Sequence, residues 1–122
     1  MNNIKALLSK KFSVFILPLL FVVSIAVAQD LTPEQYINLE ISVRTITLEE
    51  VKERATGNET GTDYKQLVKE QYQQYGISAG SHLKYGNKNK QAVAQWLESN
   101  PSKQVEMDNL TSEFNRLIQI SN

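Results

Sequence analysis

The sequence predicts an all-α protein, a small bundle of four or five short helices that follows an N-terminal signal peptide. Three observations indicate this class. Apolar residues recur at helical spacing in several segments of the chain. These segments begin at residues that favour helix N-caps and end at glycines. The first 28 residues, finally, combine a basic stretch with an apolar one, which is typical of export signals.

The export signal has the usual order of parts. Lys5, Lys10 and Lys11 precede an apolar run at 12–28, and no acidic residue occurs before Asp30. The run closes with Ala-Val-Ala, the small-x-small pattern that signal peptidase cleaves. The sequence therefore predicts a cleaved signal peptide over 1–28, a single helical domain over 29–122, and a periplasmic or secreted protein. The alternative is an uncleaved membrane anchor over 12–28, although a helix of that length spans only about 25 Å.

Composition narrows the possible partners and chemistry. After cleavage the chain would have 94 residues with 13 acidic and 10 basic side chains, a net charge of −3. This balance argues against a nucleic-acid partner, and the one basic concentration, Lys84, Lys88 and Lys90, is interpreted as a solvated loop. The absence of cysteine excludes disulfides and a lipoprotein anchor, so no stable membrane anchor would remain once the signal is cleaved.

The first predicted helix begins at Thr32, as N-cap, and Pro33, at the first helical position. We expect it to continue to Thr56 and to end at Gly57. A helical stripe within it consists of Tyr36, Leu39, Val43, Ile46 and Val51.

Residues 37–44 also alternate between apolar and polar, which is a strand pattern. No second alternating run is present to pair with them, and this favours the helix. A strand there would require pairing between subunits. A capping box at Thr47 and Glu50 predicts a break or bend in the helix near 45–47.

The second predicted helix is capped by Thr62 or Asp63 and ends at Gly76, with Ile77 completing a Schellman ending. Its apolar stripe consists of Tyr64, Leu67, Val68, Tyr72 and Tyr75.

The remaining segments are predicted as short helices. Ser78 is expected to cap a helix that reaches Tyr85, and 86–90 is expected to be a loop or a frayed link. A helix over 91–99 would bury Val93, Trp96 and Leu97. Asn100 and Pro101 are expected to start a last helix that runs to about Gln119. Its inward residues are expected to be Val105, Met107, Leu110, Phe114, Leu117 and Ile118.

The residue inventory predicts no catalytic residues, no cofactor and no metal site. There is no cysteine, one histidine, no glycine-rich phosphate loop and no calcium loop. His82 is the one candidate general base, which leaves a small hydrolase as an alternative. The favoured interpretation is a partly exposed histidine that packs through its ring, because no carboxylate or serine is placed near it by a recognisable spacing.

Six aromatic or imidazole side chains form the candidate partner surface: Tyr64, Tyr72, Tyr75, His82, Tyr85 and Trp96. Aromatic rings with a polar tip are favoured at interfaces. The helical spacing of the first three tyrosines also fits core packing, and this alternative is favoured.

The sequence thus predicts a small exported, non-catalytic binding or accessory module of the cell envelope whose partner is another protein. The first alternative is a self-assembling structural protein that pairs through 37–46, and the less favoured one is the hydrolase that uses His82. No oligomeric state is predicted.

Overall fold

The structure is a computed structural model that describes residues 31–121, so the predicted signal peptide over 1–28 lies outside the described residues. Within this part the chain forms five α-helices and no strand, which confirms the all-α prediction. The helices are α2 (Pro33–Thr56), α3 (Tyr64–Gln74), α4 (Ala79–Lys88), α5 (Lys90–Ser99) and α6 (Pro101–Ser121). None of these described helices is both long and apolar enough to span a bilayer.

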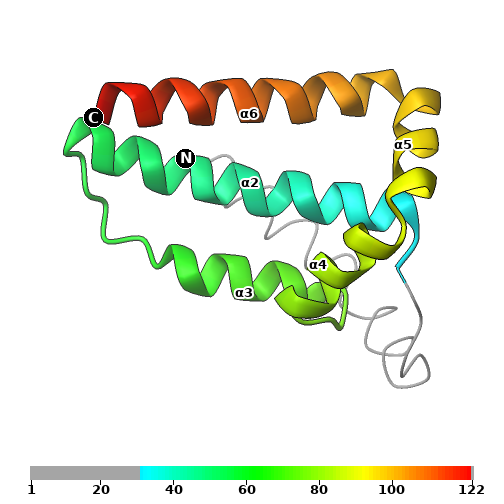
Figure 1. Ribbon diagram of the computed structural model, residues 1–122. Coiled ribbons are helices and arrows are strands. Elements are labelled where there is room, and N and C mark those ends of the chain that lie inside the picture. The colour runs from blue at the N-terminus through cyan, green and yellow to red at the C-terminus, as the bar shows by residue number, and fades with distance from the viewer. Residues whose placement is uncertain (1–30, 122) are drawn as a thin grey trace. The chain divides into compact units, whose positions relative to one another are not determined.

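Helix α2 lies in the middle of the bundle (Figure 1). Helix α6 lies along one side of α2 and runs in the same direction, whereas α3 lies along the other side and runs in the opposite direction. Helices α4 and α5 lie near the N-terminal end of α2 and connect α3 to α6. Every other helix therefore contacts α2.

Both ends of α2 are fixed by the residues that the sequence predicted. The Thr32 hydroxyl accepts a hydrogen bond from the Gln35 amide at 3.2 Å, and the Gln35 side chain accepts one from the Thr32 amide at 3.0 Å. Gly57 ends the helix with a φ of 69°, in the left-handed region. The predicted boundaries are confirmed.

The predicted break near 45–47 is wrong, because α2 is continuous from Pro33 to Thr56. Thr47 does not act as a cap. Its hydroxyl donates to the Val43 carbonyl at 2.9 Å, and the Thr45 hydroxyl likewise donates to the Ile41 carbonyl at 2.7 Å. A threonine inside a helix can satisfy its hydroxyl in this way without interrupting the backbone hydrogen bonds.

The apolar residues of α2 are buried on two opposite sides. Ile37 and Ile41 form a core cluster with Val93 of α5, while Leu39 and Ile46 lie about half a turn around the helix from them. The buried set, Ile37, Leu39, Ile41, Ile46 and Leu48, therefore differs from the single predicted stripe. Leu39 and Ile46 are buried as the stripe predicted, but the stripe was incomplete because α2 has neighbours on both sides and also buries Ile37, Ile41 and Leu48.

Helix α3 matches its prediction closely. The Asp63 carboxylate caps it by accepting from the Gln66 amide at 3.0 Å. At the other end Gly76 has a φ of 64°, and the Ile77 amide donates to the Tyr72 carbonyl at 3.2 Å. These are the features of a Schellman ending.

The predicted loop over 86–90 is wrong, and the alternative, a link between two short helices, holds only for Asn89. Ser78 caps α4 as expected, with its hydroxyl 3.1 Å from the Ser81 amide, but the helix continues through Gly86 to Lys88. Asn89 alone separates α4 from α5, and its side-chain amide donates to the Tyr85 carbonyl at 3.0 Å. The last turn of α4 is held by this bond and by its contact with α2.

Helix α6 begins at Pro101, as predicted. The Asn100 side chain, expected to cap α6, instead donates to the Trp96 carbonyl at 2.7 Å and so closes α5. Along α6, Leu117 is buried, and Met107, Leu110 and Phe114 are half-buried. Val105 and Ile118, which were expected to point inward, are 56% and 40% exposed, so this part of the prediction is wrong.

Candidate functional site

The six predicted surface residues are mostly brought together by the fold, but they are not freely exposed. His82 and Tyr64 are buried, and the other four are half-buried. His82 contacts Tyr72 and lies in the same group of rings as Tyr85. Tyr64 does not belong to this group.

The imidazole of His82 is the centre of the group and is 3% exposed. It stacks on the Tyr36 ring with centroids 4.5 Å apart, and it meets the Tyr72 ring edge-on at 5.6 Å. Its Nε2 lies 3.3 Å from the Tyr36 carbonyl oxygen, and its Nδ1 lies 3.5 Å from Oε1 of Glu40. Since a carbonyl oxygen only accepts, Nε2 is the donor in the first contact.

Tyr36 is the residue that the sequence interpretation of the site missed. Its ring also contacts Tyr85 at 5.4 Å between centroids. Gly86 allows this close approach, since a Cβ atom there would lie 2.7 Å from Cζ of Tyr36. We call Tyr36, Tyr72, His82 and Tyr85 the aromatic cluster. Its sequence signal was weak: Tyr36 was assigned to a core stripe, and nothing links it to His82 except the fold.

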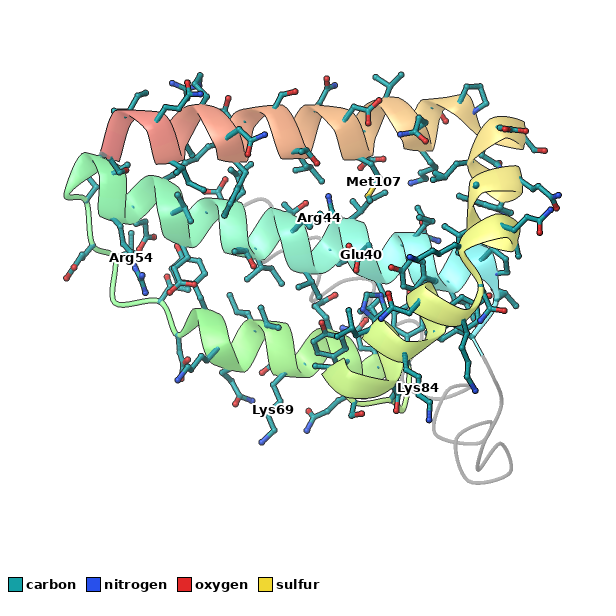
Figure 2. All side chains as sticks on the ribbon, viewed as in Figure 1. Glu40, Arg44, Arg54, Lys69, Lys84 and Met107 are labelled. Atoms are coloured by element: carbon teal, nitrogen blue, oxygen red, sulfur yellow. The ribbon has the colours of Figure 1, made fainter. Side chains whose placement is uncertain are left out.

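A chain of polar contacts leads from the aromatic cluster to α6. Glu40 faces His82 with one oxygen and accepts from Nε of Arg44 with the other at 2.8 Å. Arg44 also donates through Nη1 to the Thr111 hydroxyl at 3.0 Å. Figure 2 shows Glu40 and Arg44 along α2, between the other layers of the bundle. Residues from α4, α2 and α6 are therefore connected through one carboxylate and one guanidinium.

The tyrosines of this end of the bundle have altered acidities. Burial raises the pKa of Tyr36 above its ordinary value, and the Glu40 carboxylate adds to the effect. Burial and then Glu40 raise the pKa of Tyr72 in the same way. Burial raises the pKa of Tyr75, and the carboxylate of Glu34, in the first turn of α2, raises it further. These phenols stay neutral near pH 7 and can donate hydrogen bonds.

Trp96 is attached to the same end through apolar contacts. It packs, half-buried, against the core cluster of Ile37, Ile41 and Val93. The surface around the start of α2 therefore combines half-buried rings from α3, α4 and α5, whose members are Tyr72, Tyr75, Tyr85 and Trp96. We call these four residues the aromatic rim.

Tyr64 lies at the opposite end of α2 and has a different environment. Its hydroxyl donates to Oε1 of Glu53, which also accepts from the Thr60 hydroxyl at 2.6 Å. Burial raises the pKa of Tyr64, and the hydrogen bond to Glu53 raises it further. These contacts hold the loop over 57–63 against α2. They line a polar hollow of about 180 Å³ beside the loop.

The geometry assigns His82 a structural position. A general base must lie within hydrogen-bonding reach of its substrate, whereas this ring is enclosed by Tyr36, Tyr72 and Glu40. The hydrolase alternative gains no support from this arrangement. Among residues 31–121 no group of three or more histidine, aspartate or glutamate side chains is placed to hold a metal ion.

Comparison of the chain with known protein families, characterised proteins and solved structures finds no match, so its function is inferred from its own residues.

Proposed function

We propose that this chain is a small exported protein of the cell envelope, periplasmic or secreted, that acts without catalysis by binding another protein. The proposal of export depends on the basic and apolar segments that precede Asp30 and on the Ala-Val-Ala pattern at 26–28. The binding surface we propose is the aromatic rim.

The observation that carries the binding proposal is the gathering of the rim from three helices onto one end of the bundle. Tyr85 of α4 and Trp96 of α5 both pack against the core cluster beside the first turns of α2, and Tyr75 follows the last residue of α3, where the chain turns toward α4. Half-buried rings lose little conformational entropy when a partner covers them, since they are already partly fixed. Their neutral hydroxyls provide directional contacts at the edge of such an interface.

Tyr75 is the best residue with which to test the rim. It lies outside the core cluster, so its removal should leave the bundle folded, whereas Tyr85 and Trp96 contact that cluster. We expect Tyr75→Ala to weaken recovery of a crosslinked partner from the native envelope by tenfold or more, as for a hot-spot residue. Circular dichroism should show unchanged helix content.

The matched control is Val105→Ala. Val105 is an exposed apolar residue of α6, 56% accessible, and it lies outside the rim. A partner that is recovered equally with both variants would contradict the proposed surface. Export is tested separately by sequencing the N-terminus of the native protein, which should begin at Gln29.

A further inference from the structure

The lysines within residues 64–90 differ from the other basic residues of the bundle in their ion pairing. Every basic side chain of α2 and α6 lies within 4.0 Å of a carboxylate; the pairs are Arg44–Glu40, Lys52–Glu49, Arg54–Glu50, Lys103–Glu106 and Arg116–Glu113. In contrast, the structure gives no ion pair within the described part to Lys65, Lys69, Lys84, Lys88 or Lys90, and all five are exposed.

Positive and negative charges are unevenly distributed along the described chain. Residues 64–90 contain five lysines and a single acidic residue, Glu70, a net charge of +4. The rest of 31–121 contains five basic and eleven acidic residues, a net charge of −6. An uneven distribution of this size produces a positive surface on a domain whose total charge is negative.

Four of these lysines form one surface. Lys65 and Lys69 are one turn apart on α3, and Lys84 and Lys88 are one turn apart on α4. The edge-on contact of Tyr72 with His82 holds the two helices together. Figure 2 shows Lys69 and Lys84 projecting to the same side, away from α2. We call Lys65, Lys69, Lys84 and Lys88 the lysine face. Lys84 and Lys88 are solvated, as the sequence suggested, but they lie on α4 and not in a loop.

The chemistry of the lysine face fits a surface of many mobile anions. Its cations are all lysines, which act as point charges, whereas arginine is the usual residue for bidentate recognition of one phosphate. Leu83 precedes Lys84 in the sequence of α4 and is 66% exposed, the most exposed large apolar side chain described. Basic residues beside an exposed apolar residue are typical of helices that lie on anionic membranes.

Two other partners fit less well. Single-stranded nucleic acid requires exposed aromatic rings for stacking, but Tyr72, the aromatic ring that links α3 and α4, is half-buried against His82. A second copy of this chain would have to offer carboxylates, and five of the eleven acidic side chains outside residues 64–90 are already paired with basic groups; these are Glu40, Glu49, Glu50, Glu106 and Glu113.

We propose that the lysine face docks the protein onto the anionic lipid headgroups of a membrane, with Leu83 inserted among them. This contact is independent of the aromatic rim, so either surface can fail its test without affecting the other. It would be electrostatic and reversible, because it depends on four exposed lysines and one leucine.

The test measures binding of the protein, in the processed form isolated from its native envelope, to vesicles made of equal parts phosphatidylcholine and phosphatidylglycerol, and to vesicles of phosphatidylcholine alone. Every variant is produced in the same host and has the same N-terminus, so differences between variants report the described helices. The double variant Lys69→Gln, Lys84→Gln should bind the anionic vesicles about 25-fold more weakly, at roughly fivefold for each lysine. The control variant Asn109→Asp, Asn115→Asp makes the same change in net charge on exposed positions of α6 and should bind nearly as well as the unaltered chain.

Two further arms complete the test. Leu83→Ala should weaken binding to the anionic vesicles severalfold, and raising the salt from about 0.05 M to about 0.5 M should release most of the protein, because exposed charges are then screened. Equal binding by the unaltered chain, the lysine variant and the control would overturn the proposal. So would tighter binding to duplex DNA than to the anionic vesicles, or salt-sensitive self-association without vesicle binding.

Discussion

The imidazole of His82 lies against the phenol ring of Tyr36, with ring centroids 4.5 Å apart and an angle of 26° between the planes. The two residues are 46 positions apart in the chain, and Nε2 of His82 also lies 3.3 Å from the Tyr36 carbonyl oxygen. This stacking connects α4 to the first turn of α2 and has direct consequences for stability.

His82→Ala should lower the free energy of unfolding by about 2–4 kcal/mol, because it empties a buried site and removes both polar contacts of the ring. His82→Phe should cost less, since it keeps the stacking on Tyr36 and loses only the contacts with the Tyr36 carbonyl and Glu40. Urea unfolding followed by circular dichroism measures both. An unchanged midpoint for His82→Ala would show that the ring does not support the bundle.

Gly86→Ala should destabilise the protein by about 1–3 kcal/mol, although alanine is the better helix former. A Cβ atom at residue 86 would collide with the Tyr36 phenol, whose ring is held between His82 and Tyr85. Gly80→Ala is the matched control in the same helix, because the nearest atom to its Cβ would be the Ser78 hydroxyl oxygen at 3.8 Å. It should stabilise by about 0.5–1 kcal/mol.

Removing the Tyr36 hydroxyl provides a further check of this contact. In the Gly86→Ala background, Tyr36→Phe should recover part of the lost stability, giving a double-mutant coupling of about 0.5–3 kcal/mol. Additive effects of the two substitutions, measured by the same urea unfolding, would argue against a direct clash.

Stability should fall as the pH rises above about 10, because the pKa values of Tyr36, Tyr64, Tyr72 and Tyr75 are raised in the folded protein. Above pH 10 the unfolded chain loses phenolic protons that the folded chain still retains. The contribution of these tyrosines to the free energy of unfolding is therefore complete below the ordinary tyrosine pKa. It is lost as the pH rises through their raised pKa values in the folded protein. Urea midpoints at increasing alkaline pH measure the fall.

Tyr64→Phe isolates one contribution to this alkaline effect. The variant lacks the hydroxyl that donates to Glu53, so it should be about 1–2 kcal/mol less stable at neutral pH and should show a shallower loss above pH 10. Phenolate absorbance of the folded protein should also lose one late-titrating group. An identical alkaline slope in the variant would contradict the assignment for Tyr64.

The two threonines that resemble N-caps should respond differently to alanine. Thr32→Ala removes both bonds of the capping box and should cost about 1 kcal/mol. Thr47→Ala should change stability by less than about 0.5 kcal/mol, since its hydroxyl bonds the Val43 carbonyl within a continuous helix and alanine has the higher helix propensity. Thermal unfolding of both variants distinguishes a real cap from an internal threonine; equal losses would mean that α2 has a second start.

The candidate site could be predicted only in part. The sequence singled out His82 and the tyrosines, and the fold brings Tyr72, His82 and Tyr85 into one cluster with Tyr36. The sequence did not identify Tyr36 and Glu40 as partners of His82, because contacts between residues more than 40 positions apart leave no local pattern. Tyr64 looked equivalent to Tyr72 on the same helical face, yet it lies at the other end of α2 and bonds Glu53.

The sequence by itself determined the all-α class and the helix ends that depend on neighbouring residues. The Thr32 cap, Gly57 and the ending at Gly76 involve bonds between residues a few positions apart, so their signals are complete within a short segment. Only the tertiary structure decided which faces are buried. Residues two apart in a helix point about 200° apart, so Ile37, Leu39 and Ile41 alternate like a strand because α2 has neighbours on opposite sides. Helix α4 likewise continues through Gly86 despite the low helix propensity of glycine. A glycine is needed there because the Tyr36 ring occupies the space that a side chain would need.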